Sequence, residues 1–393
     1  MKQGWEYKKL GEVCYPKNKI QRATKCFDAF DKILYIDISS IDNTIQKMTD
    51  ITSFIFSEAP SRAQQKVEYG DIIVSTVRPN LKNIAIIDRY ESNLVASSGF
   101  CILRNTEYIE RNFLFHYITS DLFTQHLMKL TTGANYPAVR DQDVRDSIIP
   151  LPPKPIQLAI VSELDKINEL IRLKKEQLKD YDNLAQSIFY EMFGDPVENE
   201  MGWEVKKWGD LFHTILGKML DKSKQINNSS QYKYLANINV QWGYFDFSDL
   251  RSMSFTDKEL TKYELKTNDL LLCEGGEAGR CAIWNETNEI ILFQKAIHRA
   301  RLIDKNSADV LYIRYWMQFY KKNNGLKDYI SKSTIEHLTG EKLKKLPIPL
   351  PPLPLQQLFA ERIEQIEKQK AEVQQTIKDL ETLLASRMQY WFE

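Results

Sequence analysis

The sequence is poor in the features that mark secreted, membrane and metal-binding proteins. Its five cysteines are an odd number spread over 393 residues, with no Cys-x2-Cys pair and no neighbouring histidine at a zinc-ligand spacing. No apolar run approaches the roughly 20 residues that cross a bilayer, and the first residues lack the apolar stretch of a signal peptide. We therefore expect a reduced, cytoplasmic protein that does not interact with membranes.

Net charge is also absent, because 53 Lys and Arg balance 53 Asp and Glu. The charge is nevertheless distributed unevenly. Residues 1–150 carry 19 basic and 18 acidic side chains, and residues 199–348 carry 23 and 19, whereas 151–198 carry 6 and 9 and 349–393 carry 5 and 7. An anionic partner is therefore expected to prefer the two longer segments.

Motifs for chemistry on DNA are missing as well. There is no Asn/Asp-Pro-Pro-aromatic loop of an adenine methyltransferase, and the glycine-rich residues 274–280 lack the Lys-Ser/Thr of a phosphate loop. Asp71 and Asp269 have no Glu-x-Lys nearby, so we interpret them as turn residues rather than a nuclease site. Asp195-Pro196 is interpreted as a helix stop. We expect neither catalysis nor a cofactor or metal site in this chain.

What the sequence does contain is a long internal repeat. The string GWEYKKLGEV at residues 4–13 returns as GWEVKKWGDL at 202–211, and the strand motif around Asp71 returns around Asp269, both at an offset of 198. The string IPLPPKPIQ from Ile149 returns as IPLPPLPLQ from Ile348, at an offset of 199. The chain is therefore two similar halves in tandem.

Each half divides into two unlike parts. Residues 1–152 and 199–350 mix β-branched runs with helical stretches, which predicts two globular domains of mixed α/β class. Prolines at 150–155 and 347–354 form a stiff boundary. In 153–198 and 351–393, apolar residues then recur at alternating steps of four and three. We predict two helices of ~35 residues, each about 50 Å long, that hold the domains apart.

The alternating steps define a predicted coiled-coil seam, which two matching stripes favour over an ordinary amphipathic core helix. Its candidate positions, for helix pairing and for partner binding, are Leu164, Ile167, Ile171, Leu178, Tyr181, Ile188, Ile363, Ile366, Val373, Ile377, Leu380 and Leu384.

Polar residues in loops are candidate DNA contacts, because Arg reads guanine and Asn reads adenine through paired hydrogen bonds, while Lys and Thr contact phosphate. In the first half the candidates are Arg78, Asn80, Lys82, Thr132, Asn135, Tyr136 and Arg140. In the second half they are Lys218, Lys222, Arg280, Gln294, Lys295, Lys332, Ser333, Thr334 and His337. Solvated turns and half-buried strands are the alternative interpretation. Residues 130–144 and 329–343 occupy the same place but share almost no side chains, as expected for readers of different sequences.

The repeated GWE-x-K-K-x-G start, GDIIVSTVRPNL, TTGANYPAV and the I-P-L-P-P-x-P-x-Q boundary resemble the specificity subunit of a type I restriction-modification system. The resemblance covers essentially the whole chain. It implies two target-recognition domains, each reading one half of a bipartite, asymmetric site in double-stranded DNA, and two long helices that pair as an antiparallel coiled coil. It also implies that two adenine methyltransferase subunits dock on the helices, and that restriction subunits join the assembly.

In this family S-adenosylmethionine, ATP and magnesium belong to the partner subunits, so the resemblance implies a non-catalytic chain active in phage defence. The helix pair would act as a ruler. A helix of ~50 Å, against ~34 Å per DNA turn, suits half-sites whose centres lie about one to one and a half turns apart. Lys174 and Lys370 interrupt the seams, either to face the methyltransferase or to set the register. A stand-alone DNA-binding regulator and a structural scaffold are the alternatives.

Overall fold

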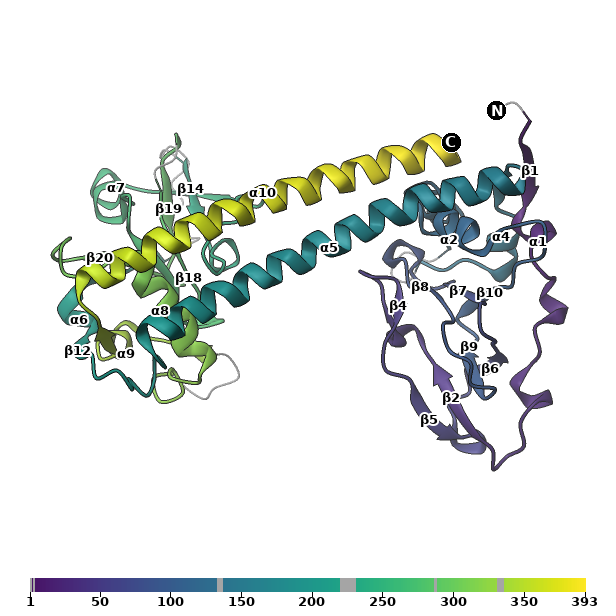
Figure 1. Ribbon diagram of the computed structural model, residues 1–393, viewed down its shortest axis with the longest axis horizontal. Helices are drawn as coiled ribbons and strands as arrows, with labels where there is room; N and C mark the ends of the chain where they lie inside the picture. The colour runs from purple at the N-terminus through teal and green to yellow at the C-terminus, as the bar shows by residue number, and fades with distance from the viewer. Residues whose placement is uncertain (1, 3, 133–136, 220–230, 286–287, 331–335) are drawn as a thin grey trace. The chain divides into compact units, whose positions relative to one another are not determined.

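The computed structural model describes all residues except 1, 3, 133–136, 220–230, 286–287 and 331–335. Its contacts form two compact units: unit 1 is Met1–Lys175 with Gln375–Glu393, and unit 2 is Glu176–Gln374. Each unit holds one globular part and one half of each long helix (Figure 1). The predicted segments 1–152, 153–198, 199–350 and 351–393 follow helix ends rather than contacts, and they stay a prediction.

The globular part of unit 1 is built on two small sheets. One has the strand order β10-β7-β8 and the other β5-β2-β9-β6. Their strands are β2 (Lys32–Ile36), β5 (Thr52–Ile55), β6 (Ala63–Lys66), β7 (Ile72–Ser75), β8 (Ile84–Ile86), β9 (Leu94–Ser97) and β10 (Phe100–Leu103). Every residue of β7 is buried, with Ile72 and Val74 in one core cluster and Ile73 in another. This alternation follows from the two-residue period of a strand with both faces covered.

Helices cover one of these cores. They are α1 (Leu10–Val13), α2 (Arg111–Thr119), α3 (Asp121–Leu130) and α4 (Asp141–Arg145). Ser120 caps α3, because its Oγ accepts a hydrogen bond from the Phe123 amide. β3 (Ile41–Asp42) and β4 (Lys47–Met48) form a separate hairpin that packs beside β8, and β1 (Glu6–Lys9) pairs antiparallel with β11 (Ile148–Leu151).

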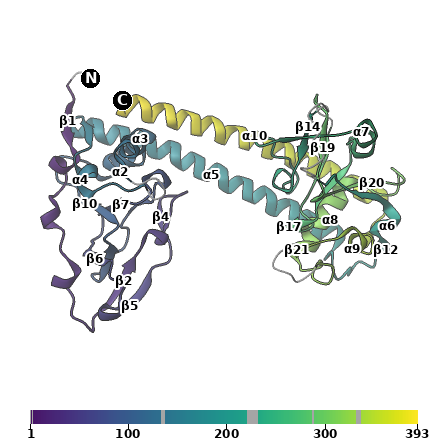
Figure 2. The ribbon, with the colours of Figure 1, turned by 180° about the vertical axis from the view of Figure 1, so that it is seen from behind.

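Unit 2 repeats this plan with small changes. Its sheets have the orders β13-β20-β16-β18, β15-β14-β19, β12-β22 and β17-β21. The strands are β12 (Glu204–Lys207), β13 (Phe212–Leu216), β14 (Gln231–Leu235), β15 (Arg251–Ser254), β16 (Leu270–Cys273), β17 (Gly275–Gly276), β18 (Cys281–Ile283), β19 (Ile291–Phe293), β20 (Ile297–Leu302), β21 (Glu336–His337) and β22 (Pro347–Leu350). The helices are α6 (Trp208–Leu211), α7 (Asp257–Tyr263), α8 (Val310–Lys322) and α9 (Gly340–Leu343). Figure 2 shows β17 and β21 from behind.

A buried ion pair between an aspartate and an arginine occurs at the same place in both units. Asp71 and Asp269 are each 1% exposed, and each carboxylate accepts two hydrogen bonds from one guanidinium, at 2.7 and 2.8 Å from Arg104 and at 2.6 and 2.7 Å from Arg301. Asp71 also accepts the Glu68 amide at 2.9 Å, and Asp269 accepts the Lys266 amide at 2.7 Å. Each aspartate was predicted to start a turn, but it ends one, because its own amide donates to the Glu68 carbonyl at 3.1 Å or to the Lys266 carbonyl at 2.9 Å. The arginine partner was not predicted.

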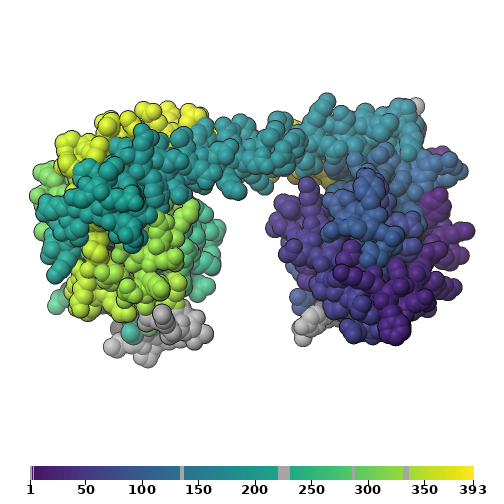
Figure 3. Space-filling model, turned by 60° about the horizontal axis from the view of Figure 1, so that its bottom comes forward, coloured from purple at the N-terminus to yellow at the C-terminus, as the bar shows by residue number. Residues whose placement is uncertain are grey.

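The two long helices are α5 (Lys154–Phe193) and α10 (Leu353–Phe392), each of 40 residues. Each begins one residue before the last proline of its cluster, so Pro155 and Pro354 lie in the first turn, where proline is tolerated. The helices were predicted to start after the prolines, and both are longer than expected. In unit 1 Glu163 bonds to Arg387, and Lys175, further along α5, bonds to Glu381, earlier in α10. In unit 2 Asp182 bonds to Lys370 and Met192 to Arg362, so the helices run antiparallel in both units. Figure 3 shows α5 in teal on the surface of both units. In the described chain, no helix is long and apolar enough to span a membrane.

Candidate nucleic-acid interface

The predicted DNA-contacting segments of unit 1 meet beyond the end of β7. The loop from β7 to β8, residues 76–83, is called tip loop 1. At its start the Thr76 amide donates to the Gly99 carbonyl at 2.9 Å, and the Thr76 carbonyl accepts the Val139 amide at 2.9 Å. The Arg78 amide donates to Pro137 at 2.7 Å. Three segments distant in the sequence are thereby joined by backbone bonds.

Unit 2 has the same frame. Tip loop 2 is residues 274–280, between β16 and β18. The Glu274 amide donates to Ala296 at 2.9 Å, and the Glu274 carbonyl accepts the Leu338 amide at 2.7 Å. Gly275 pairs with His337 in the β17–β21 ladder. The glycine-rich string is thus a loop between strands, as predicted, with a short strand of its own.

The structure places the candidates of unit 1 in two groups. Arg78, Asn80 and Thr132 are exposed, and Thr132 bridges to Ala138, which in turn bridges to Val77. Arg140 is exposed and pairs with Asp143 at 2.7 Å, whereas the Lys82 ammonium lies 2.6 Å from Asp121 and 3.1 Å from the Thr119 carbonyl. Asn135 and Tyr136 lie outside the described residues. The exposed polar side chains therefore lie at or near tip loop 1, whereas Lys82 is bonded to the ends of α2 and α3.

In unit 2 several candidate cations already have partners. Lys218 is 2.7 Å from Glu259 and from the Ser254 carbonyl, and its main chain bridges to Gln294. Arg280 donates to the Asn237 carbonyl at 2.8 Å and to Glu277 at 3.3 Å. Gln294 is half-buried, while Lys295 and His337 are exposed. Lys222, Lys332, Ser333 and Thr334 lie outside the described residues.

Each tip loop is flanked by a hairpin that was not among the predicted contacts. In unit 1 the β3–β4 hairpin places Asn43, whose amide donates to the Leu81 carbonyl at 2.9 Å. In unit 2 residues 240–245 form the equivalent turn, and Trp242 donates to Glu277 at 2.7 Å. Ile45 and Tyr244 at these turns are each 61% exposed. The sequence holds no spacing signal for them, because the hairpins are short and the repeat is weak there.

Buried thiols make poor nucleophiles in this molecule. Burial raises the pKa of Cys14 and of Cys281 to about 12, and that of Cys273 to about 11. The thiolate is therefore strongly disfavoured at neutral pH. Within the described residues, no group of three or more His, Cys, Asp or Glu is placed to hold a metal ion.

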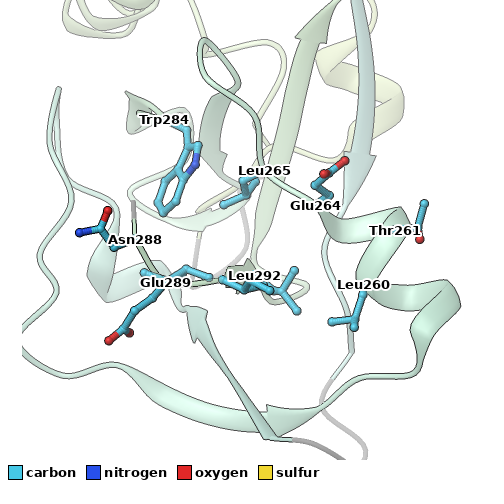
Figure 4. A pocket seen from close by; sticks show the side chains of 10 residues that line it. Leu260, Thr261, Glu264, Leu265, Trp284, Asn288, Glu289 and Leu292 are labelled. Atoms are coloured by element: carbon cyan, nitrogen blue, oxygen red, sulfur yellow. The ribbon is translucent and has the colours of Figure 1, made fainter. Parts of the chain in front are cut away.

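A cavity of about 400 Å³ lies in unit 2 between α7 and β19 (Figure 4). Its walls include Leu265, Trp284 and Leu292 together with the carboxylates of Glu264 and Glu289. Among the described residues that line the cavity, two are acidic and none is Lys or Arg. Acidic walls do not attract the phosphates of DNA. We therefore do not include this cavity in the candidate DNA interface.

The candidate seam residues are buried to different depths, and Leu164, Ile363 and Ile366 also belong to the hydrophobic cores of their units. Burial is deepest for Leu164, Ile167, Ile171, Ile363, Ile366, Val373 and Ile377, and Leu178, Tyr181, Ile188, Leu380 and Leu384 are partly buried. Lys370 is 16% exposed and lies 2.8 Å from Asp182 of α5 and 3.2 Å from Glu367. Of the two roles considered for Lys370, the structure therefore favours setting the register.

Other leucines of the helix pair face outward. Leu170, Leu173 and Leu383 are 46–47% exposed. Leu170 follows Glu163 by seven residues, or two turns, and Leu383 precedes Arg387 by four, so both lie on the flank marked by the Glu163–Arg387 ion pair. The globular part of unit 1 contacts α5 at other positions, through Gln157 and Asp165.

These features define a class of protein. Its two similar units share one backbone arrangement, and the loops at the equivalent places carry different polar side chains. The sequence matches the type I restriction modification DNA specificity domain twice, over residues 2–180 and 200–382. The chain belongs to this family. The resemblance found in the motifs is confirmed, as is the tandem fold of mixed α/β class.

Three relatives show how far the similarity extends. The specificity subunit of the EcoKI type I restriction enzyme from Escherichia coli K12 is 21% identical over 356 residues, covering 84% of this chain and 75% of that protein. A chain from a structure on complex assembly and conformational transition of the type I R-M system is 27% identical, with a TM-score of 0.67 over 100% of this chain and 98% of that one. The type I S subunit of M. genitalium, at 12% identity, shares the fold with a TM-score of 0.53 over 100% and 98%.

The function of the chain is sequence-specific DNA recognition for a type I restriction-modification system. This favours the specificity-subunit interpretation over a stand-alone regulator.

Proposed function

We propose that each unit reads one half of a bipartite, asymmetric site in double-stranded DNA. The observation that carries this proposal is the repeated frame with different side chains: the bonds of Thr76 recur at Glu274, while Arg78 and Asn80 have Gly276 and Ala278 in their places. Base edges are read by side chains held in a fixed register, and phosphate contacts supply that register. Because the two tip loops share their backbone hydrogen bonds but carry different side chains, we expect the two half-sites to differ in sequence.

Catalysis is assigned to neighbours of this chain. S-adenosylmethionine, ATP and magnesium would bind the methyltransferase and restriction subunits, and this chain would contribute position only. The chemistry of the described residues supports this assignment, because the buried thiols have raised pKa values and the candidate cations Lys82, Lys218 and Arg280 are engaged by acids of the fold.

Two methyltransferase subunits would dock on the helix pair. The seam residues are buried or partly buried in the chain itself, so docking would use the outward flank instead. Leu170, Leu173 and Leu383 supply exposed apolar area there, and leucines nearly half exposed on one flank suit a subunit contact. Helix length would then set the spacer between the half-sites, since α5 and α10 each take part in both units.

The test is adenine methylation across the genome of the source cell, read by single-molecule sequencing with the gene intact and deleted. We expect one gapped, asymmetric motif to lose its methylation on deletion. Restoring the gene on a plasmid is the control, because it brings the motif back if the loss is specific. A methylome unchanged by deletion in cells that express the system would contradict the proposal.

A further inference from the structure

The two tip loops share two left-handed backbone positions and fill them with opposite kinds of residue. The first holds Arg78, with φ 50°, in unit 1 and Gly276, with φ 75°, in unit 2. The second holds Lys82, with φ 50°, and Gly279, with φ 88°.

Backbone bonds at the far end of the loops establish the equivalence of the second position. Ser75 donates to Asn83 at 3.0 Å, and Cys273 donates to Arg280 at 2.8 Å. Tip loop 2 is therefore one residue shorter, and Lys82 corresponds to Gly279. The frame bonds of Thr76 and Glu274, two residues before Arg78 and Gly276, establish the first position in the same way.

Left-handed backbone is strained for a residue with a Cβ and open to glycine. Unit 2 uses the glycine solution twice, whereas unit 1 places a cation at both positions. Strained residues of this kind concentrate at sites where a side chain has a task. Both cations of tip loop 1 therefore need an explanation.

Lys82 has a structural one. Its ammonium bonds to the Thr119 carbonyl at the end of α2 and to Asp121 at the start of α3, so it ties tip loop 1 to both helices. The side chain of Arg78 is exposed, and its own amide donates to the Pro137 carbonyl at 2.7 Å. The backbone of Arg78 is thus rigidly placed and its guanidinium lies at the surface of the tip.

We propose that this first left-handed position determines base specificity in each half-site. Arg78 reads a guanine, because a guanidinium fork matches the O6 and N7 acceptors that guanine shows in the major groove. Gly276 brings bare backbone to the equivalent point of the other half-site. A side chain there would meet Asn237, whose Nδ2 lies 2.9 Å from the position of a Cβ. The inference rests on the proposed function and names the base class read at this position.

Two substitutions separate base reading from phosphate binding. Arg78→Gly removes the guanidinium and leaves a residue that accepts φ 50° without strain, so the loop is kept. Arg78→Lys keeps the charge and loses the fork. Asn324→Gly is the matched control, because Asn324 is also left-handed, with φ 62°, and exposed, but it lies at the end of α8. Each variant is expressed with the complete system, and the methylated motif is read by sequencing.

We expect both Arg78 variants to relax one guanine position of one half-site, with discrimination falling roughly 10- to 100-fold. The other half-site and the Asn324→Gly motif stay as in the wild type. If Arg78→Lys keeps the wild-type motif, and Arg78→Gly lowers methylation equally at every site, Arg78 binds phosphate and the inference is wrong. A wild-type chain that supports no gapped motif would instead overturn the proposed function.

Discussion

At the scale of single residues, the packing beside tip loop 2 is tight at Gly243, in the turn formed by residues 240–245. Its φ is 82°, and a Cβ there would lie 2.1 Å from Nη2 of Arg314. Arg314 is 5% exposed, and its guanidinium lies 4.1 Å from the ring centre of Tyr315. The space beside Gly243 is therefore occupied by a group that has little room to move.

We expect Gly243→Ala to lower the free energy of unfolding by about 3 kcal/mol, as the sum of about 1 kcal/mol of left-handed strain and about 2 kcal/mol of overpacking. Gly202→Ala is the control, because Gly202 has φ 68° and nothing within 4 Å of its Cβ position. Gly202→Ala introduces the left-handed strain without overpacking, so we expect it to lower the free energy of unfolding by about 1 kcal/mol. Denaturant unfolding measures both, and equal losses would contradict the packing argument.

A second residue-scale prediction concerns acid. His298 is 2% exposed, and its Nε2 lies 3.1 Å from the Leu338 carbonyl, next to the amide that holds Glu274. Burial lowers the pKa of His298, against a smaller opposing effect of Glu274 at 3.7 Å. The unfolded chain therefore takes up the proton more readily, and stability present at neutral pH is lost as the pH falls through the unfolded-state pKa of about 6.5.

We expect the free energy of unfolding to fall between about pH 7 and about pH 5, and to fall less in His298→Gln. His213→Gln, at an exposed position of β13, is the matched control for the loss of a histidine that is not buried. Denaturant unfolding at several pH values gives the slopes. Identical slopes in all three proteins would show that His298 does not carry the effect.

At the scale of elements, helix pairing and partner binding use different faces of the long helices, although the sequence pattern assigned both to the same residues. The heptad positions were predicted both to join the helices and to bind partners. In the structure the seam positions are buried or partly buried, and Lys370 is bonded across the seam to Asp182. Charges introduced at Leu178 or Ile377 would disturb this seam first, so loss of a partner in such variants would not identify a docking surface.

Docking is better tested on the outward flank. We expect the triple substitution of Leu170, Leu173 and Leu383 by Gln to release methyltransferase subunits in co-purification, because apolar contact area is lost while the seam is intact. Helix content by circular dichroism is expected to match the wild type. The control is Leu130→Gln, which changes an exposed leucine at the end of α3. Retention of the methyltransferase by the triple variant would exclude this flank.

At the scale of the whole chain, the repeat made most of the fold predictable. Two motifs at an offset of 198 and one at 199 fixed the duplication, and the proline clusters fixed the starts of α5 and α10. The candidate site was predictable only as far as its loops. Lys82 and Lys218 were assigned to DNA, yet they bond to Asp121 and Glu259, which are 39 and 41 residues away. Such distant partners could not be predicted from the neighbouring sequence. The left-handed backbone at Arg78 could not be predicted either, because an arginine rarely adopts it.

The length of the helix pair is the whole-chain variable that remains to be tested. Seven residues inserted after Lys175 and seven after Gln374 keep the heptad register of the seam, and they add about 10 Å to each helix. On axial rise alone this corresponds to about three base pairs.

We expect the methylated motif to keep both half-site sequences and to gain a longer spacer, because the tip loops are untouched and only the strut has changed. Replacing seven residues at the same places without changing the length is the control, and it is expected to keep the spacer. Sequencing of methylated adenines reads half-sites and spacer together. A wild-type spacer in the lengthened chain would mean that the helix pair does not measure the DNA, and that the globular parts themselves fix the distance between half-sites.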